Sequence, residues 1–222
     1  MAQNSVRSLQ ADIEKIQGPI LTIIVGDSKE PLHVHKSIIC NSSPFFKNAM
    51  SGSWKESKEH TLELPEDDPK IFAWYSHWLY FAKIPTIVEA VAPEDREANH
   101  SKEYHDLVEA YVLGDKLLDT KFQNSVIDAI VEKCSTPDAQ DGFQYYPNVD
   151  AINRAYNSTT KSATIRNLFV DVYVASAEPE WVTNELPKEF IHSVIQGLIE
   201  NRDFSSEVKV KASKYYVHPS RN

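Results

Sequence analysis

The chain has 222 residues, which is enough for one large domain or for a domain with an extension around a substantial core. Its formal net charge of −9 argues against a protein that binds nucleic acid by neutralising phosphates. The N-terminus lacks the apolar run of a signal peptide, and the longest apolar stretch, residues 71–82, is too short to span a bilayer. We therefore expect an intracellular protein, in the cytoplasm or the nucleus, that binds neither nucleic acid nor a membrane.

An amphipathic helix is predicted over residues 5–16, ending before Gly18-Pro19. Its apolar stripe consists of Val6, Leu9, Ile13 and Ile16. A helix this short is marginal in isolation, so the stripe is expected to pack either on its own domain or on a partner subunit.

Two strands are predicted next, at residues 21–25 and 32–35, and Gly26-Asp27 begins the turn between them. In the second strand Leu32 and Val34 point to one face, and His33 and His35 to the other. The spacing of apolar residues then becomes helical, and Pro44 separates two short helices.

A third strand is predicted at residues 61–64, and Asp68-Pro69 caps a helix that runs to about Phe81. Residues 85–101 have the composition of an exposed loop. Two helices follow as an antiparallel hairpin, in which Gly114 permits close approach and Asp119 begins the second helix.

Turn-forming residues at 136–147 predict a linker, and three helical patterns follow it. The predicted division is an N-terminal helix at 1–17, a central domain at 18–135, the linker, a C-terminal helical extension at 148–201 and a tail at 202–222. Mixed strands and helices in this order indicate an α+β protein.

The run from residue 32 to residue 50 resembles the centre of a BTB/POZ domain. The residues that carry the resemblance are Leu32, His35, Lys36, Ile39, Ser43 and Phe46. The order of elements over residues 18–134 is similar to the whole domain, which implies a small three-stranded sheet flanked by helical hairpins. Residues 148–200 look like the helical tail of stand-alone fungal BTB proteins, through Ile165-Arg166 and residues 170–174.

The resemblance implies a non-enzymatic protein–protein interaction module, acting as a homodimeric adaptor. A dimer interface would include the stripe of the N-terminal helix together with Ile38. Relatives that recruit a cullin scaffold carry a hydrophobic residue, any residue and a glutamate in one loop, which Trp54 and Glu56 match here, with Phe46 nearby. The alternatives are a self-associating scaffold or a transcription-related BTB protein without a ligase link, and the target protein stays unknown.

A metal-dependent enzyme is the remote alternative, and no cofactor is expected. His33 and His35 have a spacing that metals use, but neither a cysteine nor an acidic pair completes a site in the nearby sequence. His100 and His105, with Glu103 between them, would not align on a helix. Ser43 is expected to cap a helix rather than act as a nucleophile. The two cysteines, Cys40 and Cys134, are expected to be buried reduced thiols.

Overall fold

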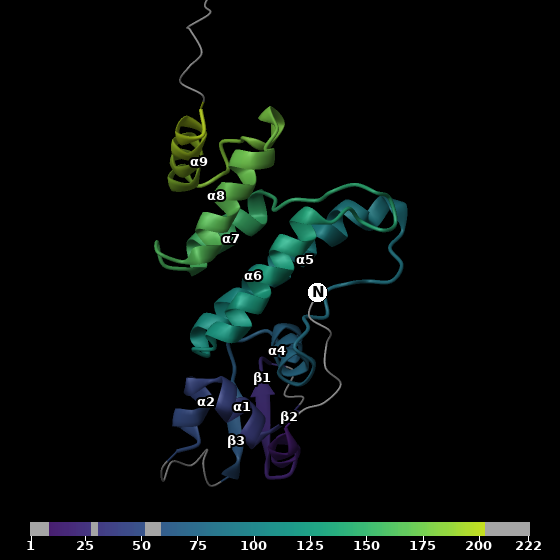
Figure 1. Ribbon diagram of the computed structural model, residues 1–222, viewed down its shortest axis with the longest axis vertical. Helices are drawn as coiled ribbons and strands as arrows, with labels where there is room; N and C mark the ends of the chain where they lie inside the picture. The colour runs from purple at the N-terminus through teal and green to yellow at the C-terminus, as the bar shows by residue number, and fades with distance from the viewer. Residues whose placement is uncertain (1–8, 28–30, 52–58, 203–222) are drawn as a thin grey trace, which may run out of the picture.

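The computed structural model describes residues 9–27, 31–51 and 59–202. Its sheet has three strands in the order β2-β1-β3 (Figure 1). The central strand β1 (Ile20–Val25) pairs antiparallel with β2 (Pro31–His35) and parallel with β3 (Thr61–Leu64). The three predicted strands are confirmed. The alternating side chains Leu21, Ile23 and Val25 of β1 are fully buried, so one face of the sheet lies on the core.

Two short helices follow the hairpin, α1 (Lys36–Ser42) and α2 (Pro44–Ala49). After β3, α4 (Pro69–Phe81) begins at Asp68, whose carboxylate accepts from the backbone N–H of Lys70 at 2.7 Å. Five side chains of α4 are buried, as its largely apolar sequence predicted: Ile71, Phe72, Trp74, Tyr75 and Trp78. The predicted capping by Asp68-Pro69 is confirmed.

The long hairpin consists of α5 (Arg96–Lys116) and α6 (Thr120–Ser135), and it crosses the middle of the molecule (Figure 1). A Cβ added at Gly114 would lie 2.7 Å from Cγ of Gln123, which confirms that the glycine permits the close approach. The prediction of a loop through residue 101 was wrong at its end. The short helix η2 (Pro93–Asp95) leads directly into α5 at Arg96.

The C-terminal helices are α7 (Val149–Ser158), α8 (Thr164–Ser176), the short η3 (Pro179–Trp181) and α9 (Lys188–Glu200). Helix α7 packs on α5, and the Arg154 guanidinium holds the Glu109 carboxylate with two hydrogen bonds. The hydroxyl groups of Tyr111 and Thr164 lie 3.0 Å apart, which connects α5 to α8. The extension is therefore packed on the helical hairpin.

Residues 136–148 form no helix or strand, in agreement with their turn-rich composition. They lie against α5, because the Tyr104 hydroxyl donates to the carbonyl of Tyr145 at 2.6 Å. The Tyr173 hydroxyl of α8 donates to the carbonyl of Pro147 at 3.2 Å. The C-terminal end of the segment predicted as a linker is thus held to α5 and α8, and its position as a domain boundary stays a prediction.

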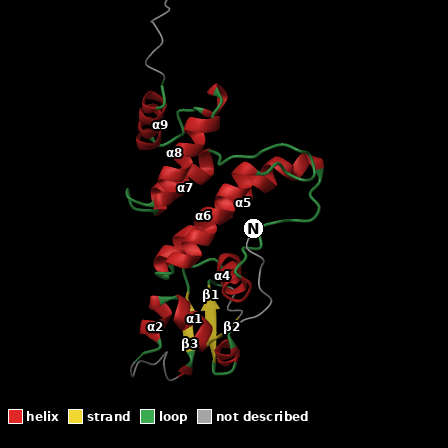
Figure 2. Cartoon of the chain, in the orientation of Figure 1, coloured by secondary structure: helices red, strands yellow, loops and turns green. Residues whose placement is uncertain are grey.

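The buried side chains form one continuous hydrophobic cluster that extends from the sheet to α9. Strands occupy one end of the molecule and helices the remainder (Figure 2). None of the helices in the described ranges is both long enough and apolar enough to cross a membrane.

Candidate protein-interaction surfaces

Ser43 fixes the turn between α1 and α2. Its hydroxyl accepts from the backbone N–H of Phe46 at 3.2 Å and donates to the carbonyl of Leu117 at 2.6 Å. The side chain is fully buried, so both hydrogen-bonding capacities are used inside the core. The prediction that Ser43 caps the helix is confirmed.

Asp119 joins three helices at the same place. One of its carboxylate oxygens accepts from the hydroxyls of Ser42 at 2.5 Å and Tyr75 at 2.9 Å, and the other accepts from the backbone N–H of Phe122 at 3.1 Å. Burial, and next the nearby Asp119 charge, raise the pKa of Tyr75, which keeps its hydroxyl protonated as a donor. The sequence indicated Asp119 only as a helix start, because its partners at residues 42 and 75 are distant along the chain.

His35 ends β2 beside Tyr80 of α4. The Tyr80 hydroxyl lies 2.8 Å from Nδ1 of His35 and accepts from the backbone N–H of His35 at 3.0 Å. His33 is exposed, and its Nδ1 lies 3.5 Å from the hydroxyl of Thr22. The imidazole of His35 therefore meets a side-chain hydroxyl from another element, α4.

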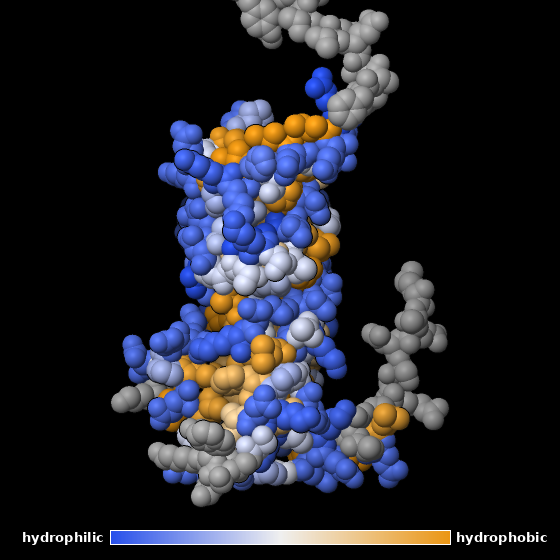
Figure 3. All heavy atoms as spheres, turned by 90° about the vertical axis from the view of Figure 1, so that its left-hand side faces the viewer, coloured by the Kyte–Doolittle hydropathy of each residue, from blue (hydrophilic) through white to orange (hydrophobic). Residues whose placement is uncertain are grey.

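Phe46, which the sequence placed both in the motif and at a partner surface, is fully buried. Its ring packs on Phe72 of α4, with centroids 6.2 Å apart, while the adjacent Phe45 is only partly buried. Hydrophobic side chains gather on the face that carries α1 and α2 (Figure 3). Phe45, rather than Phe46, is therefore the phenylalanine that an approaching partner would meet. Leu32 is partly buried on β2.

The N-terminal segment lies on α1. The described part is a 3-10 helix, η1 (Gln10–Ile16), rather than the α-helix that was predicted from residue 5. Ser37 donates to the carbonyl of Lys15 at 2.5 Å, which fixes η1 on α1. The side chains of Leu9, Ile13 and Ile16 are 74%, 51% and 57% exposed. Ile13 and Ile16, three residues apart, lie on one face of the 3-10 helix, and Leu9 precedes it. We call these three exposed apolar residues the N-terminal ridge.

Of the other residues predicted to lie at interfaces, the structure describes only some. Ile38 of α1 is partly buried. Val6, Trp54 and Glu56 lie outside the described residues. Both cysteines are free thiols, and both are partly buried, whereas buried thiols were expected.

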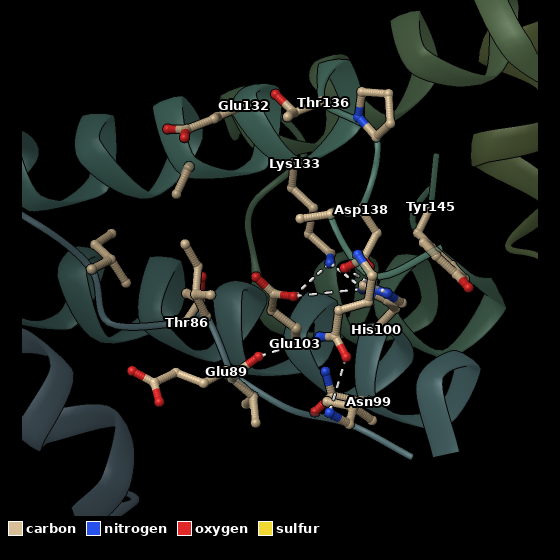
Figure 4. A pocket seen from close by; sticks show the side chains of 18 of the residues that line it. Thr86, Glu89, Asn99, His100, Glu103, Glu132, Lys133, Thr136, Asp138 and Tyr145 are labelled. Atoms are coloured by element: carbon tan, nitrogen blue, oxygen red, sulfur yellow. Dashed lines mark hydrogen bonds and ion pairs between the residues drawn. The ribbon is translucent and has the colours of Figure 1, made fainter. Parts of the chain in front are cut away.

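A groove of about 700 Å³ lies between residues 82–91, α5, α6 and the segment after α6 (Figure 4). At one end Lys133 Nζ lies 2.5 Å from Glu103 and 2.8 Å from Nδ1 of His100, whose Nε2 lies 3.4 Å from Asp138. Burial is the main cause that lowers the pKa of His100, followed by the charge of Lys133. Neutral His100 can accept from Lys133 and donate toward Asp138, so this end of the groove is internally paired.

The candidate metal ligands do not converge. His105 points away from His100, and its Nε2 lies 3.5 Å from Glu109 one turn along α5. Across the described ranges, no group of three histidine, cysteine or acidic side chains is arranged to hold a metal ion. The polar residues described above form hydrogen bonds and ion pairs with one another. Exposed apolar surfaces, such as the N-terminal ridge, are typical of binding between proteins.

A family model for the BTB/POZ domain matches residues 21–91, from β1 to the segment before η2. A comparison with curated proteins found no significant match. The observed small mixed sheet and surrounding helices agree with the α+β fold of that domain, which is a protein–protein interaction module and generally non-enzymatic. We conclude that the chain carries a BTB/POZ domain.

Proposed function

We propose that the chain is a non-enzymatic adaptor that forms a homodimer through the N-terminal ridge and helix α1. The observation that carries this proposal is the exposure of Leu9, Ile13 and Ile16 on a segment that is fixed to α1 by Ser37. Burying each of these side chains against a partner is worth roughly 1.5–3 kcal/mol before the cost of association. BTB domains often self-associate, which favours a second copy as the partner.

Light scattering at micromolar concentration tests the dimer. The intact chain should give about twice its mass of 25.2 kDa. Deleting residues 1–17, or introducing Leu9→Glu with Ile13→Glu, should lower the measured mass, because a charged ridge opposes burial at an interface. Val131→Glu changes another exposed apolar residue, on α6, and should leave the mass unchanged. A monomer for the intact chain would refute the proposal.

The adaptor function includes recruitment of target proteins to a cullin-type ubiquitin ligase through Trp54 and Glu56. Two features support it: the sequence Trp54-Lys55-Glu56 follows α2, and helices α7 to α9 follow the α5–α6 hairpin, with α7 packed on α5, α8 on α7 and α9 on α8. A tryptophan anchor at an interface contributes about 2 kcal/mol or more, and a glutamate can accept charge-assisted hydrogen bonds. Helices α7 to α9 are then the part available for a target.

Titration calorimetry against a purified cullin N-terminal domain tests the ligase link. Trp54→Ala and Glu56→Ala should each weaken binding about tenfold or more, while Lys55→Ala serves as the matched control. Thermal stability and dimer mass should not change. If the intact chain gives no binding heat, the ligase link fails and the self-associating scaffold is the function that stays.

A further inference from the structure

The groove of Figure 4 has two walls of different chemistry. One wall is α6, which places Asp128 and Glu132 in the groove at helical spacing. The opposite wall is the segment 82–91, which contributes Ile84, Ile87, Val88 and Val91. The groove therefore carries the carboxylates of Asp128 and Glu132 on one side and mainly apolar side chains on the other, where Lys83 and Glu89 also line it.

The acidic wall is available for a ligand, whereas the cations at the closed end are already engaged. Lys133 is paired with Glu103, and Arg96 lies 3.7 Å from Asp141. Asp128 and Glu132 are exposed, and neither has an ion-pair partner among the described residues. An occupant with positive charge on the side facing α6 would complement this wall.

The apolar wall is similarly uncovered in the described part of the chain. Ile87 is 89% exposed and Val88 is 49% exposed. The side chain of Gln140 accepts from the backbone N–H of Val91 at 3.1 Å and lies 3.5 Å from the carbonyl of Val88, so this part of the wall is held in place by the segment after α6. An extended peptide with apolar side chains on one face fits against such a wall.

The sequence after α9 contains such a peptide. Residues 203–222 follow directly after the described part of the chain, and residues 207–212 read Glu-Val-Lys-Val-Lys-Ala. In an extended conformation Val208 and Val210 lie on one face, and Lys209 and Lys211 on the other. Residues 204–217 carry three lysines against one acid, so the charge is opposite to that of α6.

The spacing of the lysines in this segment also matches the spacing of the two carboxylates on α6. Alternate residues of an extended chain are about 6.6–6.8 Å apart. Residues four apart on a helix, such as Asp128 and Glu132, are separated by about 6 Å along its axis.

We propose that the groove between α6 and residues 82–91 is a peptide-binding site, and that its occupant is the C-terminal segment 207–217 of this protein. In this arrangement Lys209 and Lys211 lie on the acidic wall, and Val208 and Val210 lie on the apolar wall.

Carbodiimide cross-linking of the intact protein, read by mass spectrometry, tests the placement. This reagent joins a lysine amine to a carboxylate that it contacts, so the expected products join Lys209 or Lys211 to Asp128 or Glu132. A mixture of isotopically labelled and unlabelled protein distinguishes a segment bound within its own chain from one bound to a second copy. Links of either kind support occupancy, and the absence of both overturns it.

Charge reversal gives an independent readout by amide hydrogen exchange in residues 84–92. Lys209→Glu with Lys211→Glu should speed exchange there about fivefold, as expected for the loss of two exposed ion pairs. Adding Asp128→Lys and Glu132→Lys to that variant should restore slow exchange. Asp171→Lys with Glu185→Lys makes the same change of charge away from the groove and should have no effect on this segment. Unchanged exchange in the lysine variant, or failure of the restoration, would refute the proposal.

Discussion

The hydroxyl of Tyr75 donates a hydrogen bond to Oδ2 of Asp119 at 2.9 Å, and this contact joins α4 to the start of α6. Ser42 of α1 donates to the same oxygen. Asp119 is 1% exposed and Tyr75 is fully buried, so their contact is removed from water, whereas Ser42 is partly buried. The carboxylate is therefore a connection between the family motif at residues 32–46 and the long helical hairpin.

Replacing Asp119 by alanine should be strongly destabilising. Three donors would lose their acceptor inside the core, and we expect the free energy of unfolding in urea to fall by about 3 kcal/mol or more. Tyr75→Phe removes one donor and should cost about 1–2 kcal/mol. The double variant should cost less than the sum of the two, because the residues share one interaction. Tyr146→Phe, which removes a hydroxyl that donates to the exposed side chain of Gln144, is the control. Additive losses would contradict the direct coupling.

Gly114→Ala should destabilise the α5–α6 hairpin. The added methyl group would lie 2.7 Å from Cγ of Gln123 and 3.2 Å from Cδ1 of Phe122, so side chains in a packed region must shift. Overpacking of this kind costs about 1–3 kcal/mol, measurable as a lower urea midpoint. Asn124→Ala introduces the same side chain on the exposed face of α6 and should change stability by no more than about 0.5 kcal/mol. An unchanged midpoint for Gly114→Ala would show that the hairpin does not need this close approach.

His100 should make stability depend on pH below neutrality. Its pKa in the folded protein is lowered from 6.5, so the unfolded chain binds the proton more tightly. The stability that neutral His100 contributes to the free energy of unfolding is fully present above pH 6.5. It is lost as the pH falls below 6.5 and through the pKa of His100 in the folded protein. The charged groups that act on His100 are Lys133, Glu103, Asp138 and Asp141, and Arg96 lies beside Asp141.

Urea unfolding at a series of pH values tests this dependence. His100→Gln should flatten the change of unfolding free energy between pH 6.5 and pH 5, while His192→Gln on the exposed side of α9 should not. If the two variants give the same curve as the intact protein, His100 is not the responsible group.

The cysteines should react slowly with thiol reagents in the folded protein. Burial raises the pKa of both Cys40 and Cys134, which lowers the fraction of reactive thiolate. The Cys134 sulfur also lies 3.3 Å from the Tyr104 hydroxyl. Both thiols should react with a disulfide reagent at pH 8 much more slowly before than after unfolding in urea. Rapid native reaction, or a disulfide on a non-reducing gel, would contradict the expectation.

The sequence predicted correctly those elements that are marked by alternating apolar residues or by helix-capping residues. Residues 61–64 alternate cleanly and form β3, and Asp68-Pro69 begins α4 as its capping residues indicate. The parallel pairing of β3 with β1 could not be predicted in the same way, because it depends on where the intervening helices return the chain.

Polar composition caused the main error of the sequence interpretation. Residues 96–101 resemble a loop because the first turns of α5 are largely polar, as expected for helix residues in contact with water. Residues 136–147 were predicted as a linker from their turn-rich composition, and that division stays a prediction; the composition did not indicate that Tyr145 stacks on His100, with ring centroids 3.6 Å apart. The partners of Asp119 and His35 were missed because each comes from an element more than 40 residues away.

The position of β1 at the centre of the sheet has a consequence during synthesis of the protein. β1 leaves the ribosome before β2 and β3, and β2 covers one of its edges soon afterwards. The other edge of β1 stays unpaired until β3 has been synthesised, because residues Thr61–Leu64 of β3 pair in parallel with Thr22–Val25. A nascent chain shorter than about residue 64 therefore exposes an unpaired edge of a strand rich in isoleucine, a surface prone to aggregation until the third strand closes it.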